Sequence, residues 1–172
     1  GRKPMDKWLT KWSTAKHLSS KKQIFHTIDN YIDFKPKRIL DIGCGLASES
    51  ELFQKKYGSE LYLLDGDYYS QNNITREVNY GTVEDFRFYN TIDELTNSYD
   101  SRGMKYTFVN ANNIDIPDNI TFDLVLSNLS CGFHYPANTY QDLVLKHTLP
   151  ESKIIIDIRS NHEQSGFSIV SQ

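Results

Sequence analysis

Two carboxylates and two glycines stand at a defined spacing in the first half of the chain. Asp41 precedes Gly43 and Gly45, and Asp65 follows Gly45 by twenty residues. Both carboxylates lie at the ends of short apolar runs that are typical of buried strands. Glycine lets the backbone approach a ligand closely because it has no Cβ atom. In nucleotide-binding α/β folds, an acidic residue about twenty positions after such a turn binds the ribose hydroxyls. The pattern therefore predicts an adenosine-containing cofactor.

The glycine turn also separates the classes of cofactor. A dinucleotide fingerprint requires Gly-x-Gly-x-x-Gly, and in this frame Ser48 stands in place of the third glycine. Asp41 lies two residues before Gly43, where its charge would repel a pyrophosphate but attract a cationic group. The turn therefore favours S-adenosylmethionine, which carries a sulfonium and an ammonium group, over a nicotinamide or flavin dinucleotide.

These residues resemble the first motif of the class I S-adenosylmethionine-dependent methyltransferases, an acid-x-Gly-x-Gly turn. Asp41, Gly43 and Gly45 match this motif, and Ala47 takes the place of the family's usual third glycine. The resemblance implies that the turn, including Cys44, lies against the methionine part of the cofactor. It also implies that Asp41 sits near the ammonium group or a bridging water.

The resemblance further assigns residues to the ribose and the adenine. Asp65 would bind the ribose hydroxyls, with Gly66 beside it among the cofactor-binding residues and Asp67 as a secondary candidate. The polar residue that the family places against the adenine amino group, after its third strand, is Asn112 or its neighbour Asn113. An amide oxygen accepts from that amino group, and the amide nitrogen donates to a ring nitrogen.

In this family the segment after the fourth strand faces the methyl group and the acceptor. Here it is 127–136, Ser-Asn-Leu-Ser-Cys-Gly-Phe-His-Tyr-Pro, and Ser127 completes the expected cofactor-binding set. The Cys-Gly-Phe-His-Tyr-Pro block is similar to one in small methyltransferase-like proteins, some of which are thought to act on sugars. The segment lacks the motifs of enzymes that methylate nucleic-acid bases, so we expect no nucleic-acid partner. His134 is the candidate general base, because imidazole can remove a proton from a hydroxyl at neutral pH.

Length and composition fit an ordinary soluble protein of one domain. The chain has 172 residues, of which 38% are hydrophobic and 24% charged. No apolar run approaches the length of a membrane span and no signal peptide opens the sequence, so we expect a cytoplasmic protein with no membrane partner. Cys44 and Cys131 are expected to be reduced thiols near the cleft. The other histidines have no metal-ligand spacing: His17, His26, His147 and His162.

Basic residues concentrate at the amino-terminal end. Residues 1–38 hold ten Lys and Arg against three Asp and Glu. Without interleaved stacking residues, this excess is more typical of a solvated helix face than of a nucleic-acid contact. Apolar spacing predicts helices within 5–33, and Pro36 ends this region. We therefore divide the chain into an amino-terminal helical arm, 1–36, and a cofactor-binding domain, 37–172.

Strand-like and helix-like runs alternate through the second region. They predict a Rossmann-like, doubly wound α/β fold with a mostly parallel sheet and helices on both faces. Residues 66–90, rich in Tyr and Asn, are expected to form an insertion over the cleft. Only fourteen residues follow Ile158, too few for the family's last two strands, so we expect a fold shortened at its carboxyl end. Strands are expected at 38–42, 60–64, 105–110, 122–127 and 153–158, and helices at 47–57, 91–99 and 138–147.

Three functions remain open on these observations. The leading one is methyl transfer from S-adenosylmethionine to a small-molecule acceptor, with a hydroxyl as the target if His134 is the base. The second is a protein that binds this cofactor without transferring the methyl group, or an enzyme that degrades it. The third, a dinucleotide oxidoreductase, is disfavoured by Ser48. Asp157, at the end of the last expected strand, and Arg159, which follows it, either bind substrate or pair with each other at the sheet edge.

Overall fold

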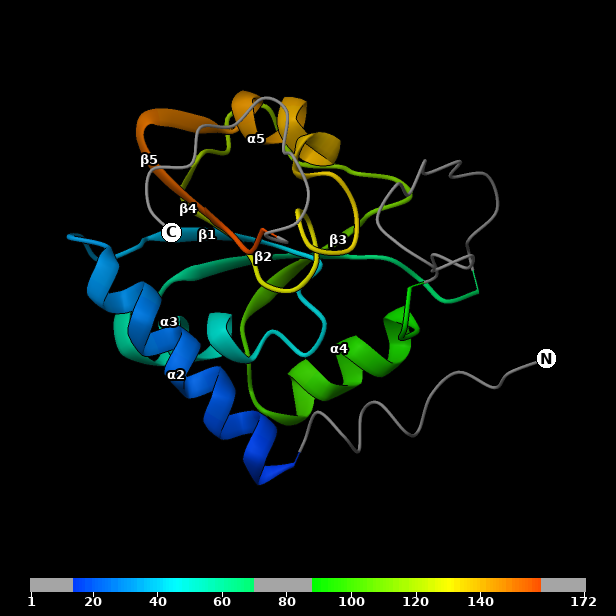
Figure 1. The fold of residues 1–172 in the computed structure, drawn as a ribbon. Coiled ribbons are helices and arrows are strands. Elements are labelled where there is room, and N and C mark those ends of the chain that lie inside the picture. Colours follow the sequence, from blue (N-terminus) through cyan, green and yellow to red (C-terminus); the bar gives the residue numbers. More distant parts are fainter. Residues whose placement is uncertain (1–13, 70–87, 159–172) are drawn as a thin grey trace.

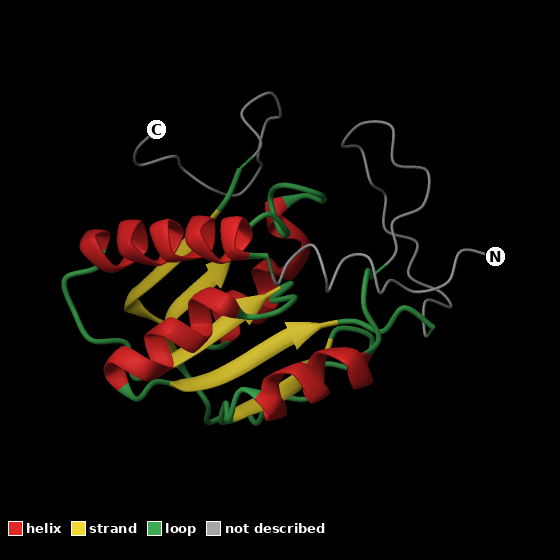
Figure 2. Ribbon diagram, turned by 90° about the horizontal axis from the view of Figure 1, so that it is seen from below, coloured by secondary structure: helices red, strands yellow, loops and turns green. Residues whose placement is uncertain are grey.

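The structure, a computed structural model, describes residues 14–69 and 88–158. Its centre is a five-stranded sheet (Figures 1 and 2) in the order β3-β2-β1-β4-β5, with every neighbouring pair parallel. The predicted Rossmann-like parallel sheet is therefore confirmed. The strands are β1 (Arg38–Ile42), β2 (Glu60–Asp65), β3 (Tyr106–Asn110), β4 (Phe122–Ser127) and β5 (Thr148–Ile156).

Helices cover both faces of the sheet, as predicted (Figure 1). One face carries α2 (Ala15–Tyr31), α3 (Ser48–Tyr57) and α4 (Ile92–Ser101), and the other carries the 3-10 turn η1 (Ala137–Tyr140) with α5 (Gln141–Lys146). The Thr14 hydroxyl caps α2 by accepting from the His17 amide at 3.3 Å. The earlier part of the helical arm predicted within 5–33 lies outside the described residues. Within the described residues, no helix combines the length and apolarity needed to cross a bilayer.

Two predicted elements differ from the structure at the carboxyl-terminal side. The single helix expected over 138–147 is broken at Tyr140, whose backbone (φ −111°, ψ 19°) leaves the helical region. The last strand begins at Thr148 rather than at residue 153, and it includes Pro150. Phe122 pairs with Thr148 while Leu124 pairs with Lys153, so residues 149–152 bulge out of the ladder. A proline is tolerated in such a bulge because no hydrogen bond of the ladder requires the N–H that proline lacks.

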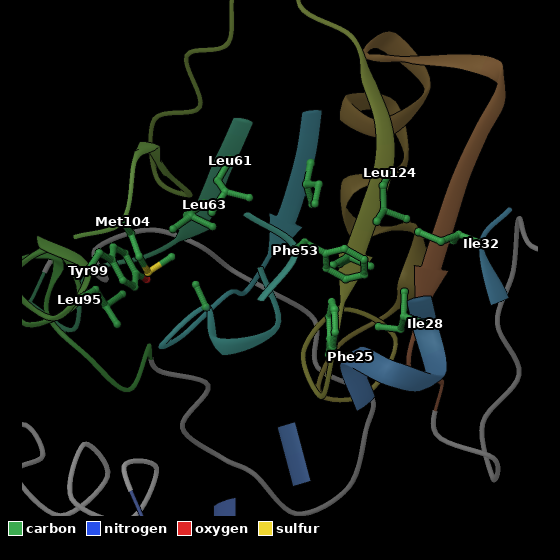
Figure 3. Close-up of a cluster of buried hydrophobic side chains, with 13 residues drawn as sticks. Phe25, Ile28, Ile32, Phe53, Leu61, Leu63, Leu95, Tyr99, Met104 and Leu124 are labelled. Atoms are coloured by element: carbon green, nitrogen blue, oxygen red, sulfur yellow. The ribbon is translucent and has the colours of Figure 1, made fainter. Parts of the chain in front are cut away.

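The larger of two apolar cores joins the sheet to α2, α3 and α4 (Figure 3). Phe53 is fully buried and meets the edge of the Phe25 ring, with centroids 4.8 Å apart. Tyr99 is also fully buried, on α4. Successive residues of a strand face opposite sides of a sheet, so Ile39 of β1 belongs to this core while Leu40 belongs to the core under α5.

Asp123 aligns the amino ends of β1 and β4. Its Oδ2 accepts from the Lys37 amide at 2.7 Å and its Oδ1 accepts from the Arg38 amide at 2.9 Å. Arg38 in turn pairs with Glu60 at the start of β2, with 2.6 Å between Nε and Oε2. With the starts of three parallel strands joined, their carboxyl ends meet at one edge of the sheet, and the predicted site residues follow those ends.

Candidate functional site

The turn between β1 and α3 runs through left-handed backbone at three residues. The φ angles are 67° at Gly43, 48° at Gly45 and 50° at Ala47. The Gly43 amide donates to the carbonyl of Leu64 at 2.7 Å, which holds the turn against the end of β2. Left-handed backbone costs an L-residue about 1–2 kcal/mol and glycine almost nothing. The left-handed backbone at Ala47 explains why the family that this motif resembles has a glycine at that position.

The carboxylate of Asp65 joins the end of β2 to this turn. Its Oδ2 accepts from the Gly45 amide and its Oδ1 accepts from the Gly66 amide, both at 2.8 Å. Each carboxylate oxygen has more than one lone pair. The two amides therefore fix the plane of the carboxylate.

Side chains at the carboxyl-terminal end of α4 hold the turn by hydrogen bonds to its carbonyl groups. The Tyr99 hydroxyl donates to the carbonyl of Gly45, and it lies 3.4 Å from the Cys44 sulfur. The Arg102 guanidinium donates to the carbonyl of Leu46 and pairs with Glu51. Burial raises the pKa of the Cys44 thiol and of the Tyr99 hydroxyl well above their ordinary values. Both groups are therefore neutral at physiological pH, and Cys44 is not a thiolate nucleophile.

A first cavity of about 340 Å³ opens beside the turn. Five residues of the predicted set line it: Gly43, Cys44, Gly45, Asp65 and His134. Much of the remaining wall is aromatic or apolar, as is usual for small-molecule sites, and includes Phe88, Tyr89, Leu129, Tyr135 and Tyr140.

The segment after β4 forms the opposite wall of this cavity. The Ser127 hydroxyl donates to the carbonyl of Ile42 and accepts from the Cys131 amide, both at 2.9 Å, which curls the segment back toward β1. Cys131 is buried, with its sulfur 3.3 Å from the carbonyl of Ala137, so it packs the segment internally. The His134 ring lies at the wall, with its centroid 6.3 Å from that of Tyr89.

A second cavity, of about 370 Å³, lies between α2 and the carboxyl ends of β1, β4 and β5. Asp41 and Ser127 of the predicted set line this cavity and not the first. Asp41 is buried, and its Oδ2 accepts from the Ser50 hydroxyl at 2.6 Å. Burial raises the pKa of Asp41 to about 7, against the lowering effect of the Ser50 hydrogen bond.

A partly buried ion pair lies in the wall that the two cavities share. Lys21 Nζ lies 2.7 Å from Glu49 Oε1, and the Asn128 amide nitrogen donates to the same oxygen. All three residues line both cavities. The sequence analysis missed them. An acid in the first turn of the helix after a glycine turn was a usable signal for Glu49, but Lys21 reaches the site only because α2 packs on α3.

The remaining predicted residues line neither cavity. Asn112 and Asn113 form a tight turn after β3, in which the Asn112 amide donates to Asn110 Oδ1 at 2.9 Å. Gly66 is covered by the Phe88 ring, which a Cβ atom would meet at 2.1 Å. Most of the expected insertion 66–90, and Arg159, lie outside the described residues. In the part of the chain that the structure describes, no group of three or more His, Cys, Asp or Glu could hold a metal ion.

Comparison with known proteins gives matches in structure. Neither a family model nor a curated protein sequence matches the chain. The plantazolicin methyltransferase BpumL, solved with SAH, is 19% identical at a TM-score of 0.51 and covers 80% of this chain and 45% of its own. The PH0226 protein of Pyrococcus horikoshii OT3 is 19% identical at a TM-score of 0.56, and the match covers 83% of this chain and 58% of PH0226. YjhP from E. coli is 14% identical at a TM-score of 0.51, and the match covers 78% of this chain and 48% of YjhP.

These matches show the fold. The chain spans about half of the length of the solved structures that it matches. At this level of identity the common feature is the fold, a parallel α/β sheet with helices on both faces, and this confirms the Rossmann-like fold predicted from the sequence.

The two glycines of the turn should differ in their tolerance of a side chain. A Cβ atom at Gly43 would lie 1.8 Å from Ser130 Oγ, whereas a Cβ atom at Gly45 meets no atom within 4 Å. Gly45→Ala should therefore cost only the left-handed backbone, about 1–2 kcal/mol, and Gly43→Ala should cost at least about 1 kcal/mol more because of overpacking. Urea unfolding of the two variants measures this difference, and equal losses would contradict the packing of Ser130 on the turn.

Asp41 should make stability fall as pH rises. Its pKa is about 7 in the folded chain against 3.8 in the unfolded one, so the folded state binds more protons between these values. The parent should lose stability between pH 5 and 7, by at most about 1.4 kcal/mol per pH unit. Asp41→Asn removes this proton, so its stability relative to the parent should be greater at pH 8 than at pH 5.

Asp118→Asn provides the control for this measurement. Lys146 lowers the pKa of the exposed Asp118 carboxyl, so it remains ionised above pH 5. The parent and this variant should show parallel stability curves from pH 5 to 8 in denaturant titrations. A curve for Asp41→Asn that is also parallel to the parent's would show that Asp41 is ionised throughout.

Proposed function

We propose that the protein binds S-adenosylmethionine in the first cavity and transfers its methyl group to a hydroxyl of a small-molecule acceptor. The observation that carries this proposal is the Asp65 carboxylate, held by the Gly45 amide at 2.8 Å on the wall of a cavity of about 340 Å³. BpumL, which has the same architecture, was crystallised with SAH. When bound, the cofactor would supply a methyl group already activated by a positively charged sulfur.

The binding half of the site follows from the turn and from Asp65. A carboxylate held in one fixed plane suits the neighbouring hydroxyls of a ribose, because its two oxygens together offer about four acceptor positions. Gly45 leaves open space above the backbone, so a ligand can lie directly against the turn. The apolar and aromatic wall excludes water from the reacting groups and aligns the acceptor with the methyl group.

The acceptor half of the proposal depends on His134. Its imidazole lies on the wall of the same cavity as Asp65 and the turn, where an acceptor must approach the methyl group. Contacts with the rings of Tyr89 and Phe133, at centroid distances of 6.3 and 5.1 Å, limit its rotation. A neutral imidazole there can take the proton of a hydroxyl as the oxygen attacks.

Binding of SAH tests the first half of the proposal. Calorimetry should detect SAH binding to the parent protein. Asp65→Asn should weaken it by about 10- to 100-fold, the value of a charge-assisted hydrogen bond, and Gly45→Ala should also weaken it because the methyl group enters the cavity. Asp118→Asn is the control, since this exposed carboxylate pairs with Lys146 and lines neither cavity. Absence of SAH binding to the folded parent would reject the proposal.

His134→Gln tests the second half. Labelled S-adenosylmethionine offered to a pool of small hydroxylated metabolites should give labelled products, and the variant should lose about 10²- to 10⁴-fold in rate with little change in SAH affinity. His26→Gln, on the exposed surface of α2, is the control. Binding without transfer would favour a cofactor-binding protein, and an unaffected variant would leave His134 a structural role.

A further inference from the structure

Asn90 is a buried polar residue in the wall of the first cavity. It is only 3% exposed, so its side chain has almost no access to bulk water. Its amide oxygen, Oδ1, is buried, and no hydrogen-bond donor among the described residues reaches it. A buried oxygen without a donor is unfavourable, because folding removes its hydrogen bond to water and supplies no replacement. A ligand in the cavity that carries an N–H group would supply the missing bond.

The backbone on both sides of Asn90 is fixed by hydrogen bonds. The carbonyl of Asn90 accepts from the Tyr68 amide at 2.9 Å. Thr91, the next residue, caps α4: its hydroxyl accepts from the Glu94 amide at 3.1 Å, and its own amide donates to Glu94 Oε2 at 2.8 Å. The side chain of Asn90 therefore extends from a rigid segment, and little conformational entropy is lost when it binds a ligand.

The contacts place Asn90 beside the chain that leaves Asp65, away from the glycine turn. Asp65 Oδ2 accepts from the Gly45 amide of that turn, whereas Oδ1 accepts from the Gly66 amide. The ring of Phe88 covers Gly66, and Phe88 lines the first cavity together with Asn90. With the ribose at the Asp65 carboxylate, the part of the cofactor on the side away from the turn is the base.

The two asparagines that the sequence predicted at the adenine lie elsewhere. Asn112 and Asn113 line neither cavity. Adenine has an amino group that donates hydrogen bonds and ring nitrogens that accept them, and an asparagine amide can form one bond of each kind. An aromatic ring such as that of Phe88 adds an apolar surface for the base. Asn90 and Phe88 therefore supply, inside the cavity, the chemistry that was expected from the turn after β3.

We propose that Asn90 makes the first cavity specific for adenine, with its Oδ1 accepting a hydrogen bond from the exocyclic amino group of the base. This inference rests on the proposed function, because it takes the ribose to lie at Asp65. It assigns recognition of the base to the residues directly before α4 rather than to the residues that follow β3.

The probes are SAH and an analogue of SAH in which hydrogen replaces the adenine amino group. In calorimetry the parent protein should bind the analogue about tenfold more weakly than SAH, because Oδ1 then has no donor. Asn90→Leu keeps the size of the side chain, and it should bind SAH and the analogue about equally. Asn97→Leu is the matched control, since this exposed residue of α4 lines neither cavity. It should retain the preference of the parent for SAH.

Three results would overturn the proposal. The first is equal binding of SAH and the analogue by the parent, which decides the question even where Asn90→Leu fails to fold. The second is a folded Asn90→Leu variant, verified by circular dichroism, that retains the preference of the parent. The third is an Asn112→Ala variant that loses this preference, because recognition of the base would then belong to the turn after β3.

Adenosine and purine riboside, its counterpart without the amino group, separate this proposal from the proposed function. Neither nucleoside has the amino-acid end of the cofactor. If SAH does not bind but adenosine binds more tightly than purine riboside through Asn90, the methyl-transfer proposal is rejected and the assignment of Asn90 stands. If SAH binds and the parent shows no preference for the amino group, the assignment of Asn90 is rejected alone. If neither SAH nor adenosine binds, both are rejected.

Discussion

The arrangement of the site depends on one hydrogen bond between two strand ends, from the Gly45 amide to the Asp65 carboxylate. The turn after β1 needs left-handed backbone at Gly43, Gly45 and Ala47, and it would be mobile without a fixed acceptor. Asp65 supplies that acceptor because the register of β1 and β2 pairs Ile42 with Leu64, directly before the two loops. The same carboxylate therefore shapes the backbone of the cleft and presents oxygens to it.

The register that makes this bond possible is set at the opposite edge of the sheet. Asp123 binds two successive amides at the start of β1, and Arg38 bridges to Glu60 at the start of β2. Because the strands are parallel, an alignment made at their amino ends is carried to their carboxyl ends. Polar pairs at the exposed edge thus position the site, although each such pair contributes little to stability by itself.

The sequence was sufficient to predict elements whose pattern is local. β1 and β4 begin and end where their apolar runs do, and the glycine turn was recognised from its spacing. The start of β5 was predicted too late because Pro150 was taken to lie outside the strand. The sequence of one strand does not show that its pairing with a neighbour can bulge around a proline. Lys21 was missed for a different reason. It lies twenty-eight residues from Glu49 along the chain and meets it only through the packing of α2 on α3.

Asp41 belongs to the same sequence motif as Gly45, but the geometry of β1 places its side chain in a different cavity. The side chains of a strand alternate between faces, so Asp41 points to the same face as Ile39, toward Ser50 on α3 and the second cavity. Beyond the strand end, Gly45 lines the first cavity and Gly43 lines both. Burial then raises the Asp41 pKa to about 7, which a group paired permanently with a cation would not show. Near neutral pH this carboxyl is therefore divided between its protonated and ionised forms, whereas an exposed aspartate would be fully ionised.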